Sequence, residues 1–161
     1  MSLSYRILLF QYLMPLVYAV AFYLLVVLPN EATINSTIFF LSGFYLGNLL
    51  LWIDGKILYP YYNELRTEPK QLITRSAVFM LVYVFLALFV ITSSGNYVGT
   101  GMIFGIGLTL LSEIFSLRNN SDAFHHKFLF QLKRRLSQLE VLRLVQGFCL
   151  VILVLTIFFF F

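Results

Sequence analysis

The chain has 161 residues, of which 60% are hydrophobic and only 11% are charged, and its mean hydropathy is +0.89. Soluble domains carry roughly 45–50% apolar and about 25% charged residues, and so short a soluble domain could not hide this much apolar surface from water. The composition therefore excludes an ordinary soluble domain and predicts an integral membrane protein. The formal net charge of +4 comes without any nucleic-acid-binding motif, so we expect no nucleic-acid partner.

Five stretches are long and apolar enough to cross a hydrocarbon core of about 30 Å, which requires roughly 20 helical residues. In chain order they cover approximately residues 7–28, 37–58, 73–92, 98–117 and 141–161. The first stretch is too long for a signal-peptide core and no cleavage pattern follows it, so we expect it to remain as a helix. The sequence predicts an all-α fold, with residues 1–161 forming a single polytopic bundle of five transmembrane helices.

The positions of the basic residues predict the orientation of this bundle. All 11 Lys and Arg side chains lie before the first stretch or beside the second and fourth connections, and the first and third connections contain none. Lys and Arg are retained on the cytoplasmic side during insertion. We therefore expect a cytoplasmic N-terminus and an external C-terminus, in a plasma or inner membrane.

Residues 121–140 are predicted to form a basic amphipathic helix on the cytoplasmic side. Asn120, Ser121 and Asp122 are good helix caps, apolar residues recur at steps of three and four, and neither Gly nor Pro interrupts the segment. The cations expected to contact a lipid or a partner are Lys127, Lys133, Arg134 and Arg135. One interpretation lays this helix on the bilayer surface, against anionic head groups. The other joins it to the last span as one long helix, whose leucine seam pairs with a second copy or another protein.

Two carboxylates fall inside the predicted spans, where an isolated charge costs perhaps 2.5–3.5 kcal/mol. Asp54 and Glu113 each lie about one helical turn from the cytoplasmic end of a span. We expect them to share one polar cluster, with Lys56 and Arg143 as the basic partners. The alternative is that each carboxylate separately reaches the interface, or pairs there with Lys56, Arg75, Arg118 or Arg143.

The same two spans carry glycines at a spacing of four residues. Gly43 and Gly47 lie in the second stretch, and Gly101 and Gly105 lie in the fourth. Small residues at this spacing let helix backbones approach closely in a membrane. We therefore expect these four glycines to be packing positions in a mutual interface between the two helices.

The sequence offers little evidence for a metal site or for catalysis. His125 and His126 are adjacent, so on a helix they point about 100° apart and do not easily share one ion. Cys149 is the only cysteine, and its apolar neighbours favour a packing role. We find no hydrolase, metalloprotease or phosphate-binding motif. The sequence thus predicts no metal and favours a protein that is not an enzyme, and it does not identify a cofactor.

These features predict a small multi-pass binding or interaction subunit at the inner leaflet. Its basic arm would contact lipid or a partner, and a shallow polar site would lie between its helices. Its expected partners are membrane lipids with anionic head groups, and a second copy or another protein. A small ion or solute transporter that uses Asp54 and Glu113 is the first alternative, and a lipid-modifying enzyme of the inner leaflet is the second.

Overall fold

The computed structural model describes residues 3–29, 34–62, 72–93 and 95–160, and these residues contain helices but no strands. The helices are α1 (Leu3–Phe22), α2 (Ile34–Ile53), α3 (Tyr59–Tyr62), α4 (Ala77–Ser93), α5 (Tyr97–Leu117), α6 (Ser121–Phe128) and α7 (Gln138–Phe160). Five-residue π-helical turns extend α1 over Tyr23–Val27 and α2 over Asp54–Leu58. A 3-10 turn over Ile73–Arg75 precedes α4.

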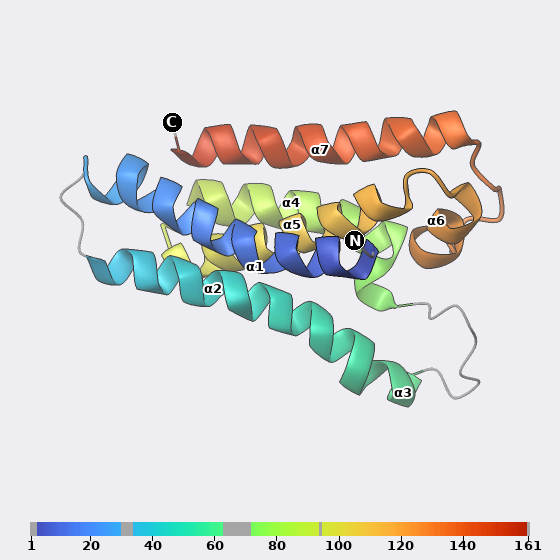
Figure 1. Ribbon diagram of the computed structural model, residues 1–161, viewed down its shortest axis with the longest axis horizontal. Helices are drawn as coiled ribbons and strands as arrows, with labels where there is room; N and C mark the ends of the chain where they lie inside the picture. The colour runs from blue at the N-terminus through green and yellow to red at the C-terminus, as the bar shows by residue number, and fades with distance from the viewer. Residues whose placement is uncertain (1–2, 30–33, 63–71, 94, 161) are drawn as a thin grey trace.

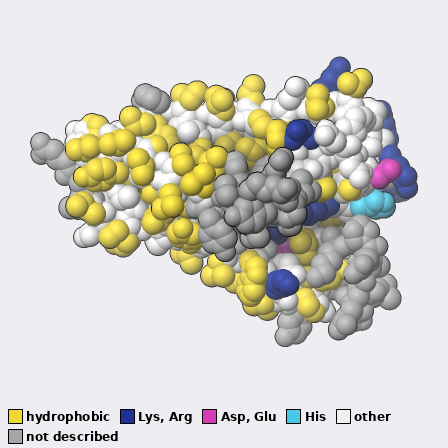
Figure 2. Space-filling model, in the orientation of Figure 1, with side chains coloured by type: hydrophobic (Ala, Val, Ile, Leu, Met, Phe, Trp, Pro, Cys, Tyr) yellow, Lys and Arg dark blue, Asp and Glu magenta, His cyan; other side chains and the backbone are white. Residues whose placement is uncertain are grey.

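The five long helices run along the long axis of the molecule and form a bundle (Figure 1). Helix α5 contacts α1, α2, α4, α6 and α7, so it is the central helix, and most of its middle portion is buried. The short helices α3 and α6 lie at one end of the bundle, and the C-terminus lies at the other end (Figure 1). The end with α3 and α6 is called the basic end below, since Lys and Arg side chains gather there (Figure 2).

Three helices are long and apolar enough to cross a membrane, namely Ile34–Leu58, Tyr97–Leu117 and Gln138–Phe160. Shorter apolar helical stretches cover Leu13–Val27 and Ala77–Thr92. Many large apolar side chains point outward from the bundle, among them Phe85 and Phe89 of α4, each 66% exposed. Such a surface is unfavourable in water and suited to lipid, which agrees with an all-helical membrane protein.

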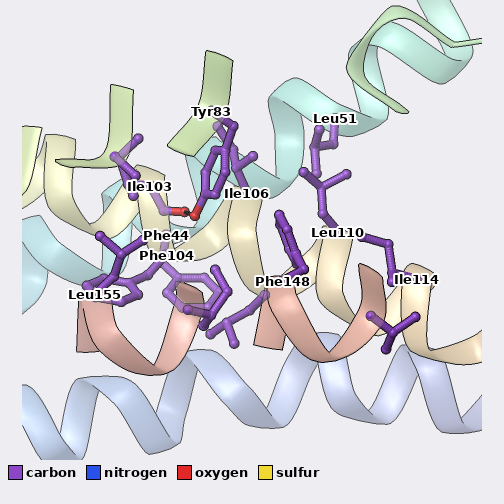
Figure 3. Packing of buried hydrophobic residues seen from close by; sticks show 14 of the residues in the cluster. Phe44, Leu51, Tyr83, Ile103, Phe104, Ile106, Leu110, Ile114, Phe148 and Leu155 are labelled. Carbon is purple, nitrogen blue, oxygen red and sulfur yellow. Dashed lines mark hydrogen bonds between the residues drawn. The ribbon is translucent and has the colours of Figure 1, made fainter. Parts of the chain in front are cut away.

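Aromatic rings fill the core toward the end of the bundle that contains the C-terminus. Phe22 stacks on Phe40 with ring centroids 4.6 Å apart, and Phe159 stacks on both rings at 5.9 Å. Further along the core, the Tyr83 hydroxyl donates a hydrogen bond of 3.0 Å to the Ile103 carbonyl (Figure 3). Paired aromatic rings add to the stabilisation from burial, so this part of the interior is dense and apolar.

Helices α2 and α5 approach each other through the four glycines singled out in the sequence. A Cβ atom added at Gly43 or Gly47 would overlap the carbonyl oxygen of Val98 or Met102 on α5. A Cβ atom at Gly101 or Gly105 would overlap a carbonyl oxygen of α2, from Phe40 or Phe44. Backbone therefore lies against backbone in both directions, and no side chain larger than hydrogen fits at these positions.

The amphipathic helix predicted over residues 121–140 is wrong beyond Phe128. Helix α6 ends there, and residues 129–137 are not helical. Phe124 and Phe128 are fully buried against the bundle. A straight helix of 20 residues would extend about 30 Å, whereas the chain must turn back at this point to enter α7.

Helix α7 instead begins with its own cap. The Ser137 backbone N–H donates to the Glu140 carboxylate at 2.8 Å, and the Glu140 N–H donates to Ser137 Oγ at 3.4 Å. This reciprocal pair is a capping box, which satisfies amide groups that the first helical turn leaves unpaired. The Gln138 side chain also donates to the Arg118 carbonyl at the end of α5, at 2.6 Å. The start of α7 is therefore fixed beside the end of α5.

Candidate functional site

Asp54 lies at the start of the π-helical turn that extends α2 and is only 2% exposed. Its Oδ2 atom accepts hydrogen bonds from the backbone N–H of Thr74, at 3.0 Å, and from the Thr74 hydroxyl. The carboxylate therefore fastens the 3-10 turn before α4 to the end of α2. Ser76 then caps α4, because its Oγ atom accepts from the Phe79 N–H at 3.1 Å.

Arg75 follows Thr74 and connects this turn to the central helix. Its Nε and Nη2 atoms donate to the two oxygens of Glu113 at 3.2 and 2.7 Å, which is a bidentate pair. Its Nη1 atom donates to the Leu51 carbonyl at 2.9 Å and to the Thr74 hydroxyl at 2.8 Å. Arg75 and Glu113 are 7% and 9% exposed, so the charge pair is buried among three helices.

Lys127 on α6 supplies a second cation to Glu113. The Lys127 Nζ atom lies 2.9 Å from Glu113 Oε2. The Lys127 side chain is 34% exposed, whereas that of Arg75 is 8% exposed, so the lysine is the more accessible of the two cations. Of the two cations that contact Glu113, Lys127 is therefore the outer one, and it connects α6 to the central helix.

The structure brings Asp54 and Glu113 into one hydrogen-bonded network, through Thr74 and Arg75. The residues that contact Glu113 are Arg75 and Lys127, where the sequence suggested Lys56 and Arg143. Lys56 is exposed, and Arg143 lies on α7 beside a different groove. Thr74 and Arg75, which are adjacent in one turn, thus link the carboxylates of Asp54 and Glu113, which are far apart in the sequence.

The remaining predicted contact residues are exposed on the segment between α6 and α7. Lys133, Arg134 and Arg135 all lie in this segment. Arg134 pairs with Glu140 at 2.8 Å, and Arg135 lies 3.6 Å from Asp122. Such exposed pairs contribute little to stability, so these cations remain accessible to a binding partner.

A cleft of about 820 Å³ opens beside the network and is lined mainly by residues of α2 between Ser42 and Trp52. Helix α2 slopes away from the rest of the bundle toward α3 (Figure 1). Leu46, Leu49 and Trp52 of α2 form part of an apolar wall. The other lining residues are Ser42, Tyr45, Asn48, Leu51, Arg75, Thr109 and Glu113. The cleft therefore combines an apolar wall with a polar floor, which is typical of sites for amphiphilic ligands.

Hydrogen bonds hold the polar floor in place. The Thr109 hydroxyl donates to the Asn48 side-chain oxygen, which joins α5 to α2 just beyond the contact at Gly47. One cation and one anion, Arg75 and Glu113, are found among the described lining residues, and they pair with each other. The floor thus offers polar atoms without an unbalanced charge, and it suits a neutral or zwitterionic group.

A metal ion does not fit the described residues of this site. No group of three or more His, Cys, Asp and Glu side chains lies close enough to hold an ion in the described part of the chain. Asp54 and Glu113 are occupied by Thr74 and Arg75.

Sequence reasoning underestimated Thr74 and Arg75. The sequence suggests Arg75 only as an interfacial cation, because a cation near a predicted helix end normally reaches toward water. The available signal was the Thr-Arg-Ser order directly before a strongly apolar helix, which suits a capped entry turn. The turn points into the bundle because Arg75 donates a hydrogen bond to Glu113, which lies 38 residues later in the chain.

Comparisons of this chain with protein-family models, with curated proteins and with solved structures find no match. The function is therefore inferred from the geometry and chemistry of the cleft.

Proposed function

We propose that this protein is a small multi-pass membrane subunit that binds the polar head group of a membrane lipid in the cleft between α2 and α5. The observation that carries this proposal is the cleft itself, about 820 Å³ in volume, with an apolar wall on α2 and the paired Arg75 and Glu113 in its floor. Pockets of roughly 300–1,000 Å³ with a few fixed polar groups are the usual form of small-ligand sites.

The proposed arrangement in the membrane has five spans, a cytoplasmic N-terminus and an external C-terminus, in a plasma or inner membrane. Five roughly aligned long helices support it, and so does the collection of Lys and Arg at one end of the bundle (Figures 1 and 2). In this orientation the cleft opens near the inner leaflet, and Lys133, Arg134 and Arg135 face anionic head groups.

Binding is favoured over transport by the interior beyond the cleft. The stacked rings of Phe22, Phe40 and Phe159 occupy the opposite end of the bundle. An ion crossing this region would lose its water without gaining polar ligands, which is very costly. The network of Asp54, Arg75 and Glu113 is therefore proposed as the fixed base of a binding site.

Trp52 provides a direct test, because it is the only tryptophan in the chain and lines the cleft. The full-length protein in a non-ionic detergent is titrated with phosphatidylethanolamine, which has a zwitterionic head group, and Trp52 emission is recorded. We expect a saturable change. Leu46→Phe adds bulk to the wall of the cleft and should weaken binding about tenfold or more.

The matched control is Leu50→Phe, which adds the same bulk to an exposed position of α2 that does not line the cleft. This variant should bind the lipid as the unmodified protein does. A non-saturating response, or equal effects of the two substitutions, would show general partitioning into the micelle and would contradict a specific cleft site.

A further inference from the structure

A second groove, about 660 Å³ in volume, lies on another side of the bundle, where α4, α5, α6 and α7 meet. Its lining is almost entirely apolar and includes Met80 and Leu81 of α4, Leu144 and Val151 of α7, and Leu132 of the segment after α6. The lining covers about one turn of α4, from Ala77 to Leu81, and about three turns of α7, from Glu140 to Val151. The groove is thus elongated in the way that an acyl chain is.

Gly147 widens this groove at its middle. A Cβ atom added at Gly147 would find no other atom within 4 Å, in contrast to the glycines between α2 and α5. No helix packs against Gly147, so close backbone approach does not explain the glycine. The missing side chain instead leaves open space along the face of α7 that lines the groove.

Glu140 and Arg143 are the two charged residues among the described lining of this groove. Glu140 is already neutralised by Arg134, and it also accepts two hydrogen bonds from Ser137. Arg143 is exposed and attracts the nearby Glu140 carboxylate electrostatically, but no hydrogen bond or close ion pair joins it to the described residues. The basic end of the groove therefore offers one unused guanidinium group.

We propose that this groove binds an anionic phospholipid, with the phosphate on Arg143 and one acyl chain along Leu144, Gly147 and Val151. A guanidinium group forms bidentate hydrogen bonds with a phosphate, and the apolar lining accepts the chain. Arg143 lies about one turn from the start of α7, and Val151 lies about two turns further along the helix. In the proposed membrane orientation, Arg143 is therefore at the depth of the head groups and Val151 is deeper. The site is separate from the cleft between α2 and α5 and takes lipids of a different charge.

Native mass spectrometry of the full-length protein in a non-ionic detergent tests this proposal. The protein is titrated with phosphatidylglycerol and, separately, with phosphatidylcholine, and the apparent Kd of each is measured. Arg143→Gln should weaken phosphatidylglycerol binding about fivefold, the effect of one cation near a membrane surface, and leave phosphatidylcholine unchanged. Gly147→Phe should weaken phosphatidylglycerol binding while keeping the charge.

Two control variants make the outcome specific. Lys133→Gln removes an exposed cation outside the groove lining, and Leu150→Phe adds bulk to an exposed position of α7 outside it. Both should leave phosphatidylglycerol binding unchanged. Equal effects of Lys133→Gln and Arg143→Gln, or no effect of Gly147→Phe, would overturn the proposal in favour of general attraction to the basic end. Repeating the titrations with Leu46→Phe separates this groove from the cleft, since that variant should affect only zwitterionic lipid.

Discussion

At the scale of single residues, the buried pair of Arg75 and Glu113 is the most consequential feature of the molecule. Removing two charges from water costs several kcal/mol for each ion, and their attraction offsets this only when the remaining polar atoms are also satisfied. Arg75 meets that condition through Glu113, the Leu51 carbonyl and the Thr74 hydroxyl. The pair therefore specifies how the turn before α4 docks onto α2 and α5.

Glu113→Gln should destabilise the protein by about 3–5 kcal/mol, because it leaves the buried Arg75 charge without a counter-ion. Lys127→Gln should cost about 1 kcal/mol or less, since its side chain is a third exposed and Arg75 still neutralises Glu113. The free energy of unfolding in mixed micelles, measured by denaturing-detergent titration, checks both values. Similar losses for the two variants would mean that the contact with Lys127, and not the pair with Arg75, accounts for the contribution of Glu113 to stability.

At the scale of helices, close contact between α2 and α5 determines the position of the cleft. The glycines bring the two backbones together over one stretch, and the Asn48–Thr109 hydrogen bond follows directly. Beyond it the helices separate, and Arg75 enters from the turn before α4 to bond the Leu51 carbonyl. The cleft is therefore a consequence of tight packing on one side and the inserted turn on the other.

Gly43→Ala should destabilise the protein by about 1–3 kcal/mol, because the new methyl group meets the backbone of Val98, which cannot rotate away. Gly147→Ala is the matched control within a helix, since open space surrounds that position. It should be neutral, or stabilising by about 0.5–1 kcal/mol from helix propensity. Thermal unfolding in detergent, followed by circular dichroism, measures the difference. Equal tolerance at both positions would contradict a tight contact between α2 and α5.

At the scale of the whole molecule, the charges are distributed asymmetrically along the bundle axis. Lys and Arg gather at the end with α3 and α6 (Figure 2), while aromatic rings fill the opposite end of the core. This distribution supports the proposed orientation, in which the basic end lies in the cytoplasm. The first connection, the connection between α4 and α5, and the C-terminus would then be external.

Single-cysteine labelling in intact cells tests this topology, after Cys149→Ser removes the only native thiol. Gln131→Cys lies in the exposed segment between α6 and α7, and it should resist a membrane-impermeant maleimide. Ser94→Cys, which falls outside the described residues, should react. Permeabilised cells provide the control for the reactivity of both thiols. Labelling of Gln131→Cys from outside would reverse the orientation and move both lipid sites to the other leaflet.

The sequence by itself determined the class of the protein and the positions of its long helices. Stretches of about 20 apolar residues need lipid around them, and only helices satisfy their backbone groups there. It also identified Asp54, Glu113 and the four glycines. A charge inside a membrane span is costly, and glycines repeated at a spacing of four residues are typical of close helix packing, so both stand out in the sequence. Each of these properties depends on local composition, which the chain carries without its fold.

Only the tertiary structure decided which residues meet. Arg75 rather than Arg143 pairs with Glu113, because the capped turn before α4 points into the bundle and α7 turns Arg143 toward a separate groove. The predicted helix over residues 121–140 stops at Phe128, because burial of Phe124 and Phe128 and the capping box at Ser137 outweigh a continuous helical pattern. The choice of ion-pair partner and the reversal of the chain after α6 depend on contacts between distant segments. The hydrophobic periodicity of one segment carries no information about such contacts.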